Sequence, residues 1–156
     1  GHLPQAARGS TYRCGCGNWG CIETFCSATA LVHLARAQGL EIDSAHQVCG
    51  MAASDDRARR ALEAFAGHLA LALYTYVLIL NPQLIVLGGG LSGSASLFLP
   101  QALLRLAELL GQREYLLPPQ GVVASNLPDL AGVIGAAYLC MDGGRIRIDA
   151  ADARDH

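Results

Sequence analysis

The fold class is decided by residues 84–90, which are Leu84-Ile85-Val86-Leu87 followed at once by Gly88-Gly89-Gly90. The apolar run is too short for a helix, is bounded by turn residues and is rich in leucine and β-branched side chains. It predicts a fully buried strand of a parallel or mixed sheet. A strand that opens through glycines onto a helix can bind phosphate or a nucleotide, because the backbone can approach the ligand closely.

These glycines match neither the Gly-x-Gly-x-x-Gly pattern of dinucleotide-binding folds nor a P-loop. A plain tight turn is therefore an equal alternative to a nucleotide site at Gly88, Gly89 and Gly90. Ser92 and Ser94 add hydroxyls that either reach a phosphate or cap the next helix.

Helical periodicity and end signals predict the other elements. The expected helices cover residues 22–37, 46–53, 57–80, 95–110 and 130–141, with a second strand over residues 121–124. The last helix is rich in alanine and glycine, so we expect it to pack closely against its neighbours. We expect the polar residues 142–156 to form a surface tail, in which residues 145–148 alternate and could pair as an edge strand. This order of elements predicts an α/β protein.

The composition limits the classes of function. The chain has 156 residues, of which 52% are hydrophobic and 15% charged, and this predicts one globular domain. Its net charge of −2 gives no general attraction to nucleic acid or to an anionic membrane. Residues 1–4 have no secretory-signal pattern, and the longest apolar stretch, residues 69–80, is shorter than a membrane span. Three of the six cysteines lie within eight residues and the other three are scattered, a distribution that favours a reduced, cytoplasmic protein with one metal site.

Three of the six cysteines gather on a glycine-rich turn, Cys14-Gly15-Cys16-Gly17-Asn18-Trp19-Gly20-Cys21. Zinc is bound by about four soft ligands, such as cysteine thiolates, in a tetrahedral arrangement. Three thiols this close together are prone to oxidation when no metal binds them. A zinc site is therefore favoured over a bare thiol cluster. We expect His2 to be the fourth ligand. Cys26 competes with it for that place. The alternative for Gly1-His2 is that these two residues are the remnant of an expression tag.

Glu23 follows the cysteines at the start of the first predicted helix. A zinc with four protein ligands is structural, because no position remains for water. Such a metal would fix the loop that aims Glu23, whose carboxylate can accept two hydroxyl hydrogen bonds. Simple charge complementarity in the first helical turn is the alternative, and residue chemistry alone favours it.

The order of these segments resembles the ROK family of sugar kinases and sugar-responsive repressors. The most specific motif begins at Gly1-His2 and continues with Cys14, Cys16, Gly17, Gly20, Cys21, Glu23 and Ser27. A second motif is Asn81-Pro82 with the strand and the glycines that follow. A third is made of Asp129, Ala131, Gly132, Gly135, Ala136 and Ala137. It implies the C-terminal lobe of an actin/hexokinase-like (ribonuclease H-like) ATPase fold with an inserted zinc knuckle. The lobe would cover residues 1–141, with a zinc and sugar loop over residues 1–27 and a nucleotide side over residues 81–141.

The resemblance also implies roles for individual residues. His2, Cys14, Cys16 and Cys21 would bind zinc, His2 and Glu23 would contact the sugar, and Gly88, Gly89 and Gly90 would line the ATP side. It places the phosphate-binding hairpin, the catalytic aspartate and a further sugar-binding glutamate ahead of Gly1. We therefore expect no catalytic base in this chain, and no activity from it alone.

The leading hypothesis is a kinase that uses ATP and Mg²⁺ to phosphorylate a hexose or N-acetylhexosamine, similar to fructokinase, glucokinase or N-acetylglucosamine kinase. The alternative is the sugar-sensing domain of a ROK-type repressor. A zinc-knuckle nucleic-acid module is disfavoured, because Lys+Arg number 11 against 13 Asp+Glu and no basic stripe flanks the cysteines. We also expect self-association or a homodimer, since a lobe without its partner exposes apolar surface.

Overall fold

The computed structural model describes residues 2–6, 12–127 and 130–141. Its elements, in chain order, are α1 (Glu23–Cys26), α2 (Ala28–Ala37), α3 (Ala45–Met51), α4 (Asp56–Leu80), β1 (Ile85–Leu87), the 3₁₀ helix η1 (Gly90–Leu97), α5 (Leu99–Leu110), the 3₁₀ helix η2 (Gly111–Leu116), β2 (Val122–Ala124) and α6 (Ala131–Met141). The predicted tail and its edge strand, Gly1 and Asp129 lie outside the described residues.

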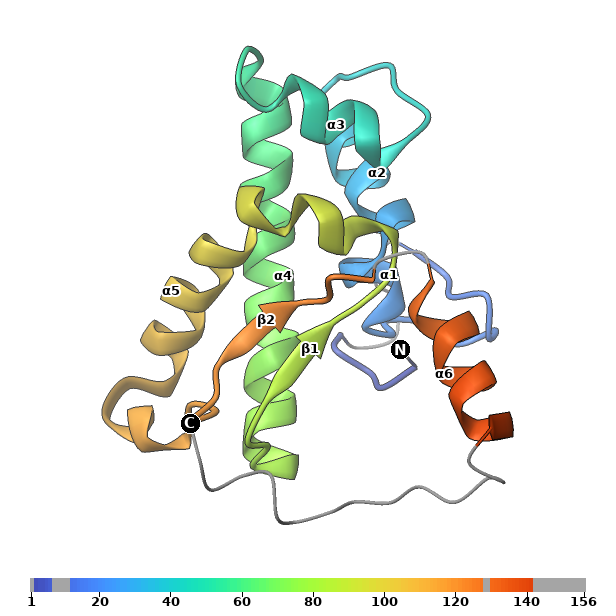
Figure 1. Ribbon diagram of the computed structural model, residues 1–156. Helices are drawn as coiled ribbons and strands as arrows, with labels where there is room; N and C mark the ends of the chain where they lie inside the picture. The colour runs from blue at the N-terminus through green and yellow to red at the C-terminus, as the bar shows by residue number, and fades with distance from the viewer. Residues whose placement is uncertain (1, 7–11, 128–129, 142–156) are drawn as a thin grey trace.

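Helix α4 is the centre of the molecule, with α1 and α2 on one side and α5 on the other (Figure 1). Asp55 caps its first turn by accepting a hydrogen bond from the Arg57 backbone N–H at 2.8 Å. Asn81 ends it in a left-handed conformation, with φ +42°, just before Pro82. The predicted boundaries of this helix are therefore correct to within one residue.

One stripe of α4 forms most of the core. Its buried side chains are Ala58, Ala61, Leu62, Phe65, Ala66, Leu69, Ala70, Ala72, Leu73 and Val77. Length and composition alone would let α4 cross a bilayer, which the sequence prediction excluded. The packing of this stripe against α2 and α5 is that of a core helix.

The two strands pair in parallel, as the α/β prediction requires. Ile85 lies opposite Val122, Val86 opposite Val123, and Leu87 opposite Ala124. The prediction that this first strand is fully buried is wrong, because Val86 is 55% exposed and Leu84 40% exposed. The core helices cover one face of the pair, and no described element buries the other.

Two of the predicted helices are broken. The helix expected over residues 22–37 divides at Ser27, whose extended backbone lets its hydroxyl cap α2 by accepting from the Ala30 N–H. The helix expected from residue 95 begins at Leu99 instead, because η1 occupies the preceding residues and Phe98 has a non-helical φ of −133°.

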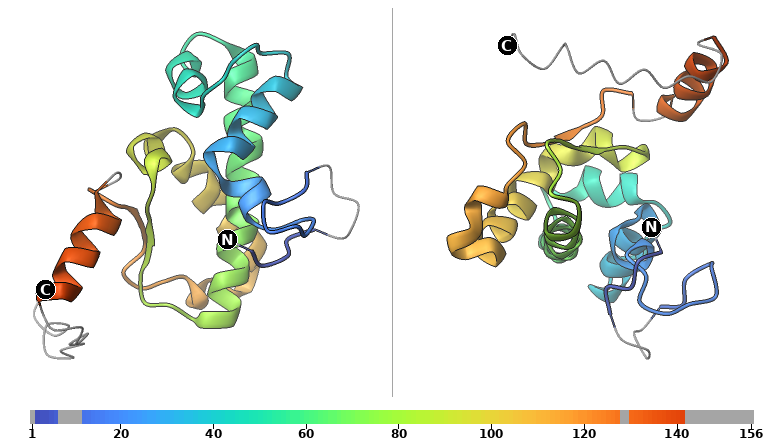
Figure 2. Two further views of the ribbon diagram at one scale, coloured as in Figure 1. Left: turned by 90° about the vertical axis from the view of Figure 1, so that its right-hand side faces the viewer. Right: turned by 90° about the horizontal axis from the view of Figure 1, so that it is seen from below.

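Helix α6 exists as predicted but does not pack as predicted. All of its residues are exposed, and it stands apart from the other helices (Figure 2). The small side chains of α6 would allow a neighbouring element to pack closely, but no described element lies against this helix.

Candidate metal and ligand site

The residues before and after the cysteine turn pair with each other. The Gly20 carbonyl accepts from the backbone N–H groups of Gln5 at 2.6 Å and Ala6 at 3.2 Å, and the Leu3 carbonyl accepts from the Ile22 N–H at 2.9 Å. Pro4 lies opposite Cys21 in an antiparallel bridge. This pairing brings the start of the described chain against the last cysteine of the turn.

The turn itself, residues 14–21, is here called the cysteine knuckle. It closes through two backbone hydrogen bonds, from the Cys14 N–H to the Asn18 carbonyl at 2.8 Å and from the Gly17 N–H to the Cys14 carbonyl at 2.9 Å. Gly17 and Gly20 have φ values of +89° and +73°, which few other residues adopt. The glycines therefore allow the reversal that folds the thiols toward each other.

Four predicted ligands meet in this knuckle. The ligand atoms of His2, Cys14, Cys16 and Cys21 all lie within 4.8 Å of one another. The Cys14 sulfur is 3.4 Å from His2 Nδ1, and the sulfurs of Cys16 and Cys21 are 3.6 Å apart. With Zn–S bonds of about 2.3 Å, the sulfurs of a tetrahedral site are about 3.8 Å apart. The donor set and its spacing therefore fit a zinc ion.

The environment of the thiols also favours a cation. Burial, together with the neighbouring sulfurs of Cys16 and Cys14, which disfavour a second negative charge, raises the pKa of Cys21 to about 11. A hydrogen bond from the Asn18 backbone lowers the pKa of the exposed Cys16. A bound metal would relieve the repulsion that keeps the buried thiol protonated.

Cys26 was the competing fourth ligand, and the structure does not place it with the other three. It lies in α1, is only partly exposed, and burial raises the pKa of its thiol to about 12. Its sulfur is not part of the four-residue group. Among the described residues, His2 is the one that lies with the three cysteines in this group.

A cavity of about 630 Å³ opens beside the knuckle. It is lined by His2, Tyr12, Arg13, Cys14, Gly15, Cys16, Glu23, Thr24, Ser27, Thr29, Ala30 and His33. Glu23 is the one carboxylate among these lining residues. The two predicted sugar contacts, His2 and Glu23, therefore face the same space, which we call the knuckle cavity.

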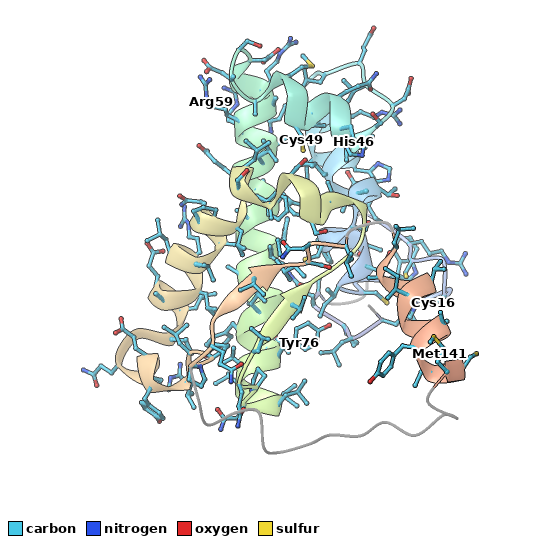
Figure 3. The ribbon with its side chains drawn as sticks, in the orientation of Figure 1. Cys16, His46, Cys49, Arg59, Tyr76 and Met141 are labelled. Atoms are coloured by element: carbon cyan, nitrogen blue, oxygen red, sulfur yellow. The ribbon has the colours of Figure 1, made fainter. Side chains whose placement is uncertain are left out.

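A second cavity of about 420 Å³ lies at the start of η1, between α2 and α3. It is lined by Ala28, Thr29, Val32, His33, Arg36, Asp43, Ser44, Ala45, His46, Gly90 and Leu91. Figure 3 labels Cys16 at the knuckle and His46 on α3, which mark the two regions. We call this second space the glycine-loop cavity.

The glycines contribute unequally to the glycine-loop cavity. Gly90 lines it, whereas Gly88 and Gly89 are not among its lining residues. Gly89 has φ +91° and ψ 172°, a conformation that only glycine adopts readily. The Ser92 hydroxyl donates to the Gly89 carbonyl at 2.8 Å and Ser92 is 6% exposed, so this hydroxyl holds the loop from within.

Sequence reasoning missed Tyr12, Thr29 and His33, which line the cavities. Thr29 and His33 are four residues apart on α2 and therefore share a face. Polar residues at this spacing on an otherwise apolar helix were the available signal. Tyr12 stacks on His33 with ring centroids 4.6 Å apart, a contact that no local pattern contains.

Comparison with known proteins agrees with these features. A family profile described as the ROK family matches residues 1–142. The N-acetyl-D-glucosamine kinases of Escherichia coli O6:H1 and Pasteurella multocida are 33% and 34% identical to the chain over 131 and 139 residues. These alignments cover 81% and 82% of this chain but 41% of each relative, so the chain spans less than half their length.

Two solved structures are similar as well. A ROK family glucokinase from Streptomyces griseus, in complex with glucose and AMPPNP, has a TM-score of 0.78 and 26% identity, and covers 89% of this chain and 49% of its own. A ROK family transcriptional regulator, a homologue of the Escherichia coli MLC protein, has a TM-score of 0.62 and 26% identity, over 80% of this chain and 33% of its own. Because the family profile matches nearly the whole length of the chain, the chain belongs to the ROK family.

Proposed function

We propose that this chain carries the sugar-binding and nucleotide-binding surfaces of a ROK sugar kinase, within the C-terminal lobe of an actin/hexokinase-like fold. The observation that carries the proposal is the pair of cavities along α2, one beside Glu23 and one beside Gly90. Its relatives include N-acetyl-D-glucosamine kinases and a glucokinase, so the proposed substrate is a hexose or an N-acetylhexosamine.

The proposed role of His2, Cys14, Cys16 and Cys21 is to hold one zinc ion. With four protein ligands the metal supplies a cross-link and no catalytic chemistry. It would fasten the N-terminal segment to the knuckle and so fix the wall of the knuckle cavity. The six cysteines are free thiols in this structure, which suits a reducing compartment, and we place the protein in the cytoplasm.

Sugar binding is assigned to Glu23 and His2. The Glu23 carboxylate can accept hydrogen bonds from two hydroxyl groups, and the first turn of α1 favours its charge. His2 directs Nδ1 toward the Cys14 sulfur, which leaves Nε2 for a sugar hydroxyl. No other carboxylate lines the cavity in the described part of the chain, so we propose that these residues bind the sugar without activating it.

Nucleotide binding is assigned to the glycine-loop cavity. Gly90 offers backbone there without side-chain bulk, and His46 adds a polar side chain. Arg36 also lines this cavity, where it is paired with Asp43. ATP would enter with Mg²⁺, which neutralises phosphate charge in phosphoryl transfer. The base that orients the sugar hydroxyl is not assigned to any residue here, so we expect binding but no transfer from this chain alone.

The test is a binding experiment on the zinc-loaded chain. Trp19, the one tryptophan of the sequence, lies in the knuckle, so its fluorescence can report sugar binding. N-acetylglucosamine and glucose should each change the emission, and AMPPNP should bind by calorimetry. Absence of any sugar or nucleotide binding to a folded, zinc-loaded chain would overturn the proposal.

A sugar-sensing domain is the second candidate, because the ROK transcriptional regulator has a similar structure. The two candidates differ at the glycine-loop cavity. A sensor needs the sugar site alone, whereas a kinase must also hold ATP. Sugar binding without AMPPNP binding would therefore favour the sensor.

Self-association is proposed from the exposed apolar surface. The exposed side chains include Val86 and Val123 on the sheet and Val133, Tyr138 and Met141 on α6. Large exposed apolar side chains that gather on one surface are usually covered by a partner in solution. Light scattering coupled to size-exclusion chromatography should find a homodimer or larger species.

A further inference from the structure

One face of α2 borders both cavities. The lining residues of the knuckle cavity and of the glycine-loop cavity have only Thr29 and His33 in common. These two residues are one helical turn apart, so their side chains project from the same face. A group at this position can reach ligands in both spaces.

His33 has unused hydrogen-bonding capacity. Its ring is partly buried and stacks on Tyr12 with an interplanar angle of 21°, which fixes the plane of the imidazole. Among the residues that the structure describes, neither ring nitrogen of His33 has a hydrogen-bond partner. The ring is therefore oriented by stacking and leaves its polar edge for a ligand.

Three neighbouring polar side chains on the cavity walls already make hydrogen bonds. Thr24 donates its hydroxyl to the Cys21 carbonyl at 2.7 Å, and Ser27 caps α2. Arg36 donates to the Ile42 carbonyl at 2.9 Å and pairs with Asp43 at 2.8 Å. His33 differs from these neighbours because it is held by an aromatic contact and not by a polar one.

We propose that His33 donates a hydrogen bond to the terminal phosphate of the nucleotide where it meets the sugar, and so couples the binding of the two substrates. The inference rests on the proposed function, since a kinase must bring the phosphate and the acceptor hydroxyl together. Imidazole suits the task, because an N–H donor to a charged oxygen forms a strong hydrogen bond. His33 forms no covalent bond in this role.

The experiment measures four dissociation constants on the zinc-loaded chain. N-acetylglucosamine and AMPPNP are each titrated alone and in the presence of a saturating amount of the other. In the unaltered chain each ligand should bind more tightly when the other is present. His33→Ala should weaken AMPPNP about tenfold, as expected for loss of a charged hydrogen bond, and should abolish the coupling.

Two control variants each change one cavity. Glu23→Gln alters only the knuckle cavity and should weaken only the binding of the sugar, while His46→Ala alters only the glycine-loop cavity and should weaken only the binding of AMPPNP.

His33→Gln keeps an N–H donor but loses the aromatic stack on Tyr12. It should restore AMPPNP affinity to within about threefold of the unaltered chain.

The outcomes separate the inference from the proposed function. If the unaltered chain binds both ligands and His33→Ala keeps their affinities and coupling, the inference is wrong and the proposed function remains. If His33→Gln fails as badly as His33→Ala with unchanged zinc content and helicity, the ring only packs against Tyr12, and the inference is again wrong. If the unaltered chain binds neither ligand, both fail.

Discussion

The cysteine knuckle and the glycine loop, residues 88–92, are both glycine-rich turns beside a cavity, yet they are held differently. The knuckle depends on contacts between side chains and between segments distant in sequence, because Cys14 and Cys21 are buried and Gly20 lies against Ala6. In the glycine loop, a Cβ added at Gly88 or at Gly89 would meet no atom within 4 Å. The loop depends on its own backbone conformation and on one serine.

This difference predicts how each turn responds to change. A turn held by ligands and packing loses its shape when one contact is removed, since the others depend on the same arrangement. A turn held by its backbone should tolerate loss of neighbouring groups but not a change of φ. Perturbations of the knuckle should therefore have larger effects than perturbations of the glycine loop.

Zinc removal should have the largest effect. Metal analysis should find about one zinc per chain, and a strong chelator should shift the emission of Trp19, which is 42% exposed in the knuckle. The far-ultraviolet circular dichroism of α4 and α5 should change little, because their core does not include the knuckle. The loss should thus be local.

Two variants sharpen this test. Cys21→Ser should abolish zinc retention, whereas Cys26→Ser should retain it, because Cys26 lies outside the four-ligand group. His2→Ala should weaken retention and would distinguish a true ligand from a tag remnant. A purified chain without zinc, in which all six thiols react freely, would remove the basis of the comparison.

Gly20→Ala should have the next largest effect. A Cβ at Gly20 would collide with the Ala6 carbonyl, and the residue already has φ +73°. The strain should cost about 2–3 kcal/mol and separate the N-terminal segment from the knuckle. Zinc should then leave faster in the presence of a chelator, as measured with a colorimetric metal indicator.

Gly15→Ala is the matched control within the same turn. A Cβ at Gly15 meets nothing within 4 Å, and its φ lies outside the left-handed region. Its free energy of unfolding should stay within about 0.5 kcal/mol of that of the unaltered chain, and its zinc should be released at the same rate. Equal effects of the two substitutions would show that the close approach at Gly20 has no role.

Sequence patterns predicted the local features well. The cysteine spacing identified three of the four clustered residues, and the cap at Asp55 with the stop at Asn81 located α4, because these signals act within one turn of the chain. Burial could not be predicted in this way. The exposure of Val86 and of all α6 depends on which elements lie opposite them, and apolar composition cannot specify this.

Local sequence patterns also could not predict the contacts between residues that are distant in sequence. The stack of Tyr12 on His33 joins the knuckle region to α2 across 21 positions, and the resemblance to ROK proteins contained no motif for it. His2 was the expected fourth ligand, with Cys26 as the competitor, but the pairing that brings its segment against Cys21 was not predicted. The site was therefore predictable where its residues are adjacent in sequence.

Gly89→Ala should have a smaller effect than Gly20→Ala. Its φ of +91° and ψ of 172° carry a strain of about 1–3 kcal/mol for alanine, but no neighbouring atom would collide with the new Cβ. AMPPNP binding should weaken while zinc retention stays unchanged. Gly88→Ala, which meets no neighbour and has no left-handed φ, should leave both unchanged.

Ser92→Ala should have the smallest effect. It removes the hydroxyl that donates to the Gly89 carbonyl, but that carbonyl still accepts from the Ser92 backbone N–H at 2.9 Å. Because no buried acceptor is left without a partner, the cost in thermal unfolding should be about 0.5–1 kcal/mol. Ser94→Ala, whose hydroxyl has no hydrogen-bond partner among the described residues, should be nearly neutral.

The same variant tests how the glycine loop is held. If Ser92 only supports the loop, Ser92→Ala should weaken AMPPNP binding by no more than its small cost in stability. A large loss of AMPPNP affinity with unchanged stability would mean that the hydroxyl contacts the nucleotide directly. The glycine loop would then resemble the knuckle, since a side chain and not the backbone alone would form its site.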